Sequence, residues 1–104
     1  MNAKVFVTED TRHNLSRAME FGDIEIVETE DFPQFRNGKP VLERVTRKLL
    51  TFNADDDYLL LVGDPVLIGL CTAALAKMGH KIIKVLKWDN QSRRYLPINL
   101  PLAL

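Results

Sequence analysis

The feature that most constrains this 104-residue sequence is an apolar run followed at once by a helix start. Residues 58–62 are consecutive apolar side chains with no polar alternation, a pattern typical of a strand buried on both faces of a parallel sheet. Asp64 and Pro65 come directly after Gly63, and these residue types favour the N-cap and the first position of a helix. The helix that they begin is expected to end before Gly79. A buried strand joined to a helix in this way indicates an α/β fold.

Other segments supply the remaining elements of such a fold. The sequence predicts strands at residues 3–8, 24–28, 58–62, 80–88 and 93–100, and helices at residues 41–52 and 65–78. We therefore predict a small mixed sheet of about five strands in the order β-β-α-β-α-β-β, with a parallel centre, a C-terminal antiparallel hairpin and two main helices. Pro97 has no N–H to donate, which places the last strand at the edge of the sheet. Residues 14–21 fit either a helical turn or an extended loop, and residues 31–40 should form a surface loop.

Composition limits the classes of protein that the chain can belong to. Its length suits one domain, so we predict a single α/β domain over residues 1–104. Lys and Arg number 14 and Asp and Glu also number 14, so no overall field draws the chain to nucleic acid or anionic lipid. No apolar stretch is long enough to span a membrane. Cys71 is the only cysteine, which excludes an intrachain disulfide and a CxxC site, and burial in its apolar helix should leave the thiol inert.

The predicted helix at residues 65–78 has almost no polar side. Its first charged residue is Lys77, whereas a helix on one face of a small sheet usually presents a polar stripe to water. We therefore expect either the loop-rich first third of the chain or a second copy of the chain to cover the helix. Its small residues would permit a close helix–helix approach. The candidate residues of an oligomer interface are Leu67, Leu70, Ala73 and Ala74.

Polar residues follow the first and third predicted strands, at the edge where open α/β sheets usually bind ligands. One interpretation is that Asp10 and Asp64 hold a divalent metal while Arg12 or His13 meets a phosphate, as in metal-dependent phosphoryl transfer or nucleotide binding. The simpler interpretation, which we favour, is that Asp64 caps its helix and that the other residues form a solvated loop. Gly63 stands alone, without the spacing of a phosphate-binding glycine loop.

The predicted C-terminal hairpin is basic. Residues 81–95 carry five cations and one acid, whereas residues 9–31 carry eight acids and two arginines. Cations with interleaved aromatics suit nucleic-acid binding, and segments of opposite charge suit contacts between proteins. The simpler interpretation places Trp88 in the core and the cations on an ordinary hairpin surface. The candidate nucleic-acid-binding residues are Lys84, Lys87, Trp88, Arg93, Arg94 and Tyr95.

The second half of the chain also resembles a known group of proteins. The segments 57–70, 84–89 and 94–98 are similar to a block found in small uncharacterised proteins of tailed bacteriophages, whereas the first third matches only loosely. The resemblance implies a phage protein in an infected cell, and it implies neither a reaction nor catalytic residues.

We therefore predict a non-enzymatic phage accessory protein, a small α/β binding or assembly module of the host cytoplasm that acts through protein–protein contacts. The expected partners are a second copy of the chain, as a homodimer, or a host or phage protein. No cofactor and no membrane contact is expected. The alternatives are a metal-dependent or nucleotide-binding protein that uses Asp10 and Asp64, and a nucleic-acid-binding protein that uses the basic hairpin.

Overall fold

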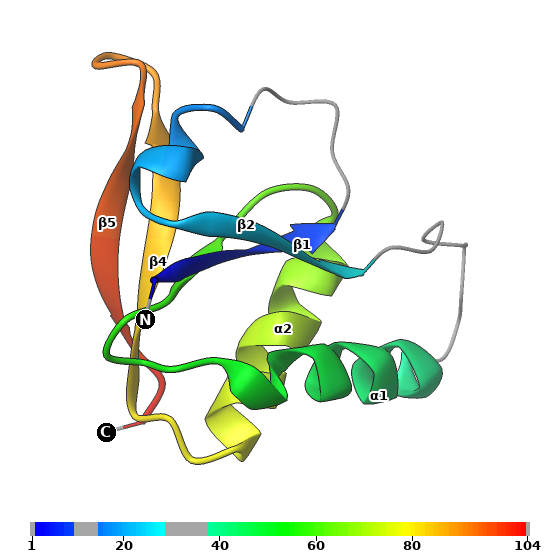
Figure 1. The fold of residues 1–104 in the computed structure, drawn as a ribbon. Coiled ribbons are helices and arrows are strands. Elements are labelled where there is room, and N and C mark those ends of the chain that lie inside the picture. The colour runs from blue at the N-terminus through cyan, green and yellow to red at the C-terminus, as the bar shows by residue number, and fades with distance from the viewer. Residues whose placement is uncertain (1, 10–14, 29–37, 104) are drawn as a thin grey trace.

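The computed structural model describes residues 2–9, 15–28 and 38–103. Its elements are β1 (Lys4–Glu9), the 3-10 helix η1 (Ala18–Glu20), β2 (Asp23–Glu28), α1 (Lys39–Lys48), the 3-10 helix η2 (Leu49–Thr51), β3 (Tyr58–Leu60), α2 (Pro65–Lys77), β4 (Ile82–Asp89) and β5 (Arg94–Pro101). The described strands form a five-stranded sheet in the order β2-β1-β3-β4-β5 (Figure 1). Neighbouring strands are parallel except β4 and β5, which form an antiparallel hairpin. The predicted mixed α/β fold is therefore confirmed.

The strand order identifies the edge of the sheet at which a ligand site is expected. From β1 the chain crosses to β2 on one side, and after α1 it returns to β3 on the other side of β1. The order of the strands thus reverses between β1 and β3. In open α/β sheets, ligands bind outside the carboxyl ends of the strands at such a reversal.

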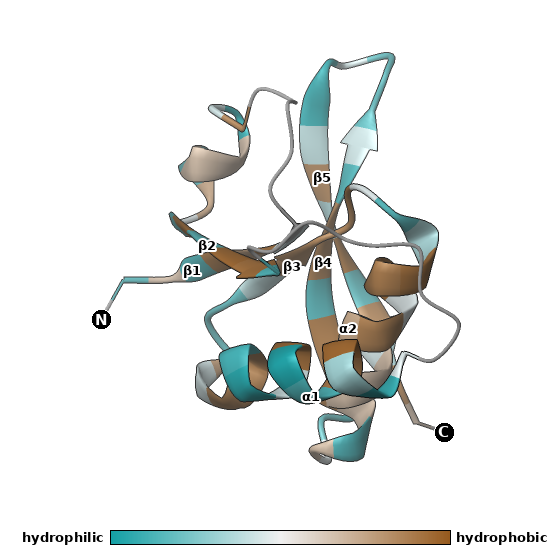
Figure 2. Cartoon of the chain, turned by 90° about the vertical axis from the view of Figure 1, so that its right-hand side faces the viewer, coloured by the Kyte–Doolittle hydropathy of each residue, from teal (hydrophilic) through white to brown (hydrophobic). Residues whose placement is uncertain are grey.

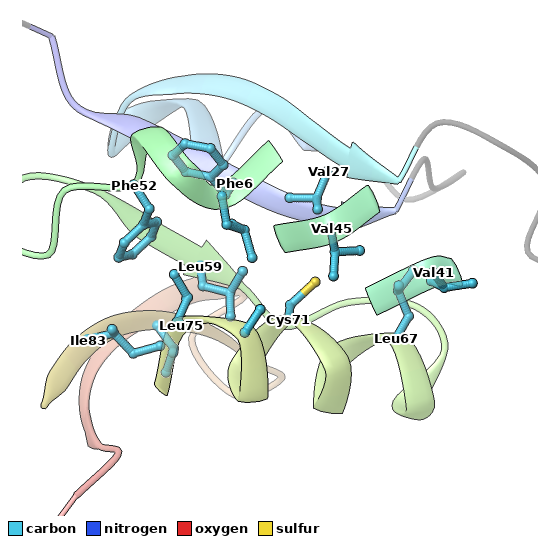
Figure 3. Close-up of a cluster of buried hydrophobic side chains, with 13 residues drawn as sticks. Phe6, Val27, Val41, Val45, Phe52, Leu59, Leu67, Cys71, Leu75 and Ile83 are labelled. Atoms are coloured by element: carbon cyan, nitrogen blue, oxygen red, sulfur yellow. The ribbon is translucent and has the colours of Figure 1, made fainter. Parts of the chain in front are cut away.

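The two faces of the sheet have different covers. Phe6, Leu59 and Ile83 pack with side chains of α1 and α2 in the larger core cluster (Figure 3). Their chain neighbours Val5 and Leu60 point to the opposite face and belong to a second cluster, which Ala18 of η1 helps to close. Both long helices therefore lie on one face, with η1 on the other (Figure 1). The prediction that β3 is buried on both faces is confirmed, because Leu59 and Leu60 are fully buried.

The first long helix ends earlier than its apolar pattern predicts. The spacing predicted a helix to residue 52, whereas α1 ends at Lys48 and the chain tightens into η2. Leu49 and Phe52 are nevertheless buried, and the Phe52 ring lies 5.3 Å from the Phe6 ring, centroid to centroid. The tighter 3-10 turn keeps both side chains in the core, so the apolar pattern continues beyond the α-helix itself.

The second long helix begins and ends as predicted. The carboxylate of Asp64 accepts a hydrogen bond from the Val66 N–H over 2.8 Å, and Pro65 is the first helical residue. After the helix, Gly79 adopts a positive φ of 98°, a conformation that glycine allows at little cost. Among the described helices, none has the length and apolarity needed to cross a membrane.

Small side chains on the exposed side of α2 explain how the helix tolerates water without a polar stripe. Leu67, Cys71 and Ala74 are buried in the core beneath α1 and above the sheet, while Ala73 and Gly69 are exposed and Leu70 is half-buried. Exposed glycine and alanine present little apolar area to water, so the exposed side of the helix costs little beyond its first turn, where Val66 is 56% exposed. The predicted oligomer interface is thereby corrected at Leu67 and Ala74, because both side chains lie inside the chain itself.

A glycine allows β2 to begin beside β1. A Cβ atom on Gly22 would lie 2.3 Å from the carbonyl oxygen of Ala3, far inside van der Waals contact. The next residue, Asp23, donates its N–H to that same oxygen over 3.0 Å and pairs with Lys4 as the ladder starts. The absence of a side chain at Gly22 is therefore required for the first hydrogen bond between the two strands.

The terminal hairpin forms the edge of the sheet, and its outer side is partly blocked. Leu102 donates its N–H to the Lys81 carbonyl over 2.7 Å, so alternation along the ladder turns the even-numbered residues of β5 toward β4. Tyr95, Pro97, Asn99 and Pro101 then direct their backbone groups outward. Proline has no N–H, so Pro97 and Pro101 remove half of the donors from this edge. The predicted edge position of the last strand is confirmed.

Candidate functional site

The carboxyl ends of β1 and β3 are tied together by the chain's own groups. The Thr8 hydroxyl donates a hydrogen bond to the carbonyl oxygen of Val62, which joins the end of β1 to the segment after β3. Thr8 itself is fully buried. At the described part of the strand-reversal edge, an internal hydrogen bond therefore links β1 to the segment that follows β3.

The predicted metal pair is only partly within the described residues. Asp10, together with Arg12 and His13, lies outside them. Asp64 lies at the edge, and its carboxylate receives the Val66 N–H, so the simpler interpretation of Asp64 as a helix cap is confirmed. Across residues 2–9, 15–28 and 38–103, no three His, Cys, Asp or Glu side chains gather as metal ligands.

Sequence analysis missed a buried ion pair near this edge. Glu28, at the end of β2, is only 3% exposed, and its Oε2 accepts hydrogen bonds from the Arg44 guanidinium of α1, from Nε at 3.2 Å and Nη2 at 2.9 Å. A charge-assisted fork of this kind compensates a buried carboxylate for the water that it loses. No local spacing links residues 28 and 44, so only the tertiary structure reveals the pair.

Cys71 lies in α2 within the core, close enough to this ion pair to be affected by it. Burial raises the pKa of the Cys71 thiol to about 12, and the negative charge of Glu28 adds to the effect. The reactive form of cysteine is the thiolate, and near neutral pH this side chain carries a thiol instead. The position and pKa agree with the inert, structural cysteine that the sequence predicts.

A second acidic group is also used internally. Asp57 is 5% exposed, and it accepts the N–H of Lys4 over 2.9 Å and the N–H of Asn53 over 2.8 Å. These bonds tie the start of β1 to the turn that precedes β3. Asp57 therefore holds the entry to two central strands, and its oxygens are committed to backbone donors.

The structure does not gather the predicted nucleic-acid residues on one surface. Tyr95 is buried and packs edge to face against Trp88, with ring centroids 5.0 Å apart, and burial raises the pKa of the Tyr95 phenol. The Lys84 ammonium lies 4.6 Å from the centroid of the Tyr58 ring and donates to the Asp55 carbonyl over 2.7 Å. Both residues thus serve the chain's own packing.

The remaining predicted residues are exposed but face in different directions. Lys87, Trp88, Arg93 and Arg94 all reach solvent. Because successive side chains of a strand point to opposite faces, Lys87 and Trp88 lie on opposite sides of the hairpin. Trp88 is 40% exposed, and its indole N–H donates to the Asn90 side chain over 3.0 Å. A stacking platform would therefore consist of a single ring.

Apolar exposure is concentrated on the same hairpin. Of the seven large hydrophobic residues that are exposed in the described structure, four lie on β4 and β5, namely Ile82, Trp88, Leu96 and Ile98. In Figure 2 the hairpin rises past α1 and α2, so neither long helix covers its turn end. This exposed apolar surface on the hairpin is the most prominent feature of the described surface that the chain itself does not use.

These features define a small α/β protein whose described polar groups support its own structure and whose exposed apolar residues gather on one hairpin. Residues 3–102 match the family described as Phage Pam3 gp32-like protein. The match covers almost the entire chain, so the protein belongs to this phage protein family, in agreement with the resemblance of its second half to tailed-bacteriophage proteins. No curated protein and no solved structure matches the chain.

Proposed function

We propose that this phage protein is a non-enzymatic accessory module of the infected host cytoplasm that acts by binding another protein through the β4–β5 hairpin. The observation that supports this proposal is the number of exposed apolar residues on that hairpin, with Leu96 and Ile98 on one face and Ile82 and Trp88 on the other. Exposed apolar side chains that lie together, flanked by charged residues, are typical of a protein-binding site.

The described polar and titratable groups on the helix-covered half of the molecule support the same proposal. Asp64 caps α2, Glu28 pairs with Arg44, and the Cys71 thiol is buried with a raised pKa. Catalytic groups are usually exposed to a substrate and adjusted toward the working pH. The described groups are instead committed to internal partners, so we rank catalysis and metal-dependent phosphoryl transfer below binding.

A second copy of the chain is one candidate partner. The exposed side of α2 carries Gly69 and Ala73, and such small residues would allow two helices to approach closely. Hairpin contacts between copies would also remove Leu96 and Ile98 from water. Light scattering at increasing protein concentration distinguishes a homodimer from a monomer that binds a different protein.

The proposal can be tested by photo-crosslinking in infected cells. A photoreactive amino acid placed at Leu96 on β5 is expected to give a discrete protein adduct, identified by mass spectrometry. The matched control carries the same group at Leu50, an equally apolar and more exposed leucine that lies in η2, away from the hairpin. The control is expected to give no adduct of that mass.

Two outcomes would contradict the proposal. Equal labelling from Leu50 and Leu96 would mean that the hairpin is no preferred binding surface. Absence of protein adducts at both positions, together with a rise in melting temperature on adding Mg²⁺ or a nucleotide, would favour the small-ligand alternative instead.

A further inference from the structure

The helix layer on one face of the sheet stops before the last strand. On this face, which we call the helix side, Ile83 and Val85 of β4 are buried. Their direct partners on β5 are Leu100, which is half-buried, and Ile98, which is 41% exposed. The next residue on the same face of β5, Leu96, is 39% exposed. Cover is thus complete over Ile83 and Val85 at the centre of β4 and is lost at their neighbours one strand further out.

The widths of the sheet and of the helix layer explain why β5 is left partly uncovered. Strands lie about 4.8 Å apart and helices pack about 10 Å apart. The five strands therefore span about 19 Å from first to last axis, whereas two helices in contact span about 10 Å between axes. α1 contacts β2, while α2 contacts β1 and shares the larger core cluster with Ile83 and Val85 of β4. Leu96 and Ile98 lie beyond this cluster, so the part of β5 that carries them has room for a further helix.

Cations stand at both ends of this uncovered strip. Alternation along β4 places Lys81 and Lys87 on the helix side with Ile83 and Val85, and both lysines are exposed. Lys87 pairs with Leu96, at one end of the strip, while the bond from Leu102 places Lys81 at the other end. Six residues of strand separate the two lysines by about 20 Å. A ligand that fits the strip would thus be apolar along its length and acidic at both ends.

The prolines of β5 indicate whether the ligand is an added β-strand or an α-helix. An added β-strand would bind through the outward backbone groups of the edge, but Pro97 and Pro101 contribute no N–H there. An α-helix satisfies its own backbone and contacts a surface through side chains alone. The strip on the helix side therefore suits a helix laid beside α2 better than a strand added to the edge.

We infer that the helix-side strip of Leu96, Ile98 and Leu100 binds an amphipathic helix of another protein, with acidic residues near both helix ends to meet Lys81 and Lys87. At a rise of 1.5 Å per residue, about 13 residues cover the separation of the lysines. The inference rests on the proposed function, since it names the form and the charge of the protein partner. The chain's described helices do not match this pattern, because α1 is mainly basic and Lys77 is the only charged residue of α2.

A selection experiment with a matched pair of variants tests the inference. The full chain is used to select binders from a display library of short segments tiled over the phage and host proteomes. The selected segments are then measured against Ile98→Glu and against Ile82→Glu. Both substitutions place a carboxylate on an exposed isoleucine of the same hairpin, but alternation along the strands puts Ile98 on the helix side and Ile82 on the opposite face. Circular dichroism confirms that each variant is folded.

The expected segments are amphipathic helices with acids near both ends. Their affinity should fall about tenfold or more with Ile98→Glu and should change little with Ile82→Glu. Lys87→Glu should weaken binding in low salt and have less effect in high salt, because exposed charges are screened.

Several outcomes would overturn the inference. The inference fails if no segment is selected, or if the selected segments have the alternating apolar pattern of a strand. It also fails if the helix-side strip binds a second copy of this chain. If the photo-crosslinked partner binds well to Ile98→Glu but poorly to Ile82→Glu, the protein-binding function stands while the helix-side strip is excluded. If the chain crosslinks to no protein at all, the proposed function fails together with the inference.

Discussion

The carboxyl edge of the sheet and the terminal hairpin use their notable residues in opposite ways. At the edge, charged and polar side chains turn inward: Glu28 pairs with Arg44, and Asp64 holds the start of α2. On the hairpin, apolar side chains turn outward, as Leu96 and Ile98 do. Asp64, which suggests chemistry in the sequence, thus serves stability, while apolar residues that would suit a core are exposed on the hairpin. The following substitutions test this contrast by separating loss of stability from loss of binding.

The largest expected effect is that of a core leucine beneath α1. Leu67→Ala removes fully buried side-chain volume, and the free energy of unfolding should fall by about 2–5 kcal/mol. Leu96→Ala, on the hairpin, should cost less than about 1 kcal/mol, because that side chain is already partly in water. Urea denaturation of both variants measures the difference. If Leu67→Ala instead had little effect on unfolding but altered the oligomeric state, Leu67 would belong to an interface after all.

A pair of arginine substitutions makes the same comparison for charge. Arg44→Ala removes the guanidinium from a carboxylate that is 3% exposed and should lower the free energy of unfolding by about 3 kcal/mol. Arg94→Ala on the exposed hairpin should change it by less than about 0.5 kcal/mol. Adding Glu28→Gln to Arg44→Ala should recover part of the loss, since the neutral side chain is cheaper to bury. Equal costs for the two single arginine variants would contradict a structural role for the ion pair.

Loss of the helix cap should have a smaller effect. Asp64→Ala leaves the Val66 N–H without its carboxylate acceptor and should cost about 1 kcal/mol, whereas Asp64→Asn, which keeps an acceptor, should cost less. Thermal melts with and without Mg²⁺ or Mn²⁺ provide the measurement. A metal-dependent rise in melting temperature that disappears in Asp64→Ala would restore the metal interpretation of this residue.

The smallest expected effect is measured on the unaltered chain, as the rate at which a thiol reagent labels Cys71. Because burial raises the pKa of Cys71 to about 12 from its ordinary 9.0, a thiol reagent at mildly alkaline pH should label it only as fast as the fold opens. The raised pKa also means that the thiol's contribution to stability is complete below about pH 9 and is lost as the pH rises toward 12. Rapid labelling of the native chain, at the rate seen in urea, would show that the core around α2 is open.

The fold was more predictable from the sequence than the use of its residues. The strand at residue 58, the cap at Asp64 and the edge position set by Pro97 are local signals, and each is confirmed. The position of β1 between β2 and β3 depends on pairing between distant segments, which no local pattern encodes. The burial of Leu67 and Ala74 was missed for a related reason: a helix that is apolar on every side does not indicate which side faces the core.

The same limit applies to the candidate sites. Glu28 and Arg44 meet because β2 and α1 pack together, and the spacing of residues 28 and 44 gives no hint of it. On the hairpin, the sequence predicted a basic surface and assigned Trp88 to the core in its simpler interpretation. In the structure the two rings are direct partners on the same face of the hairpin, but Tyr95 is buried in the cluster that contains Ala18 of η1, whereas Trp88 is 40% exposed.

The close approach at Gly22 has a consequence for other chains of this family. Where the Ala3 carbonyl leaves no room for a Cβ atom, any relative that keeps this strand pairing must keep glycine at the matching position. A relative with a larger residue there has to displace the start of its second strand. That glycine therefore offers a fixed point for aligning the first two strands of such proteins.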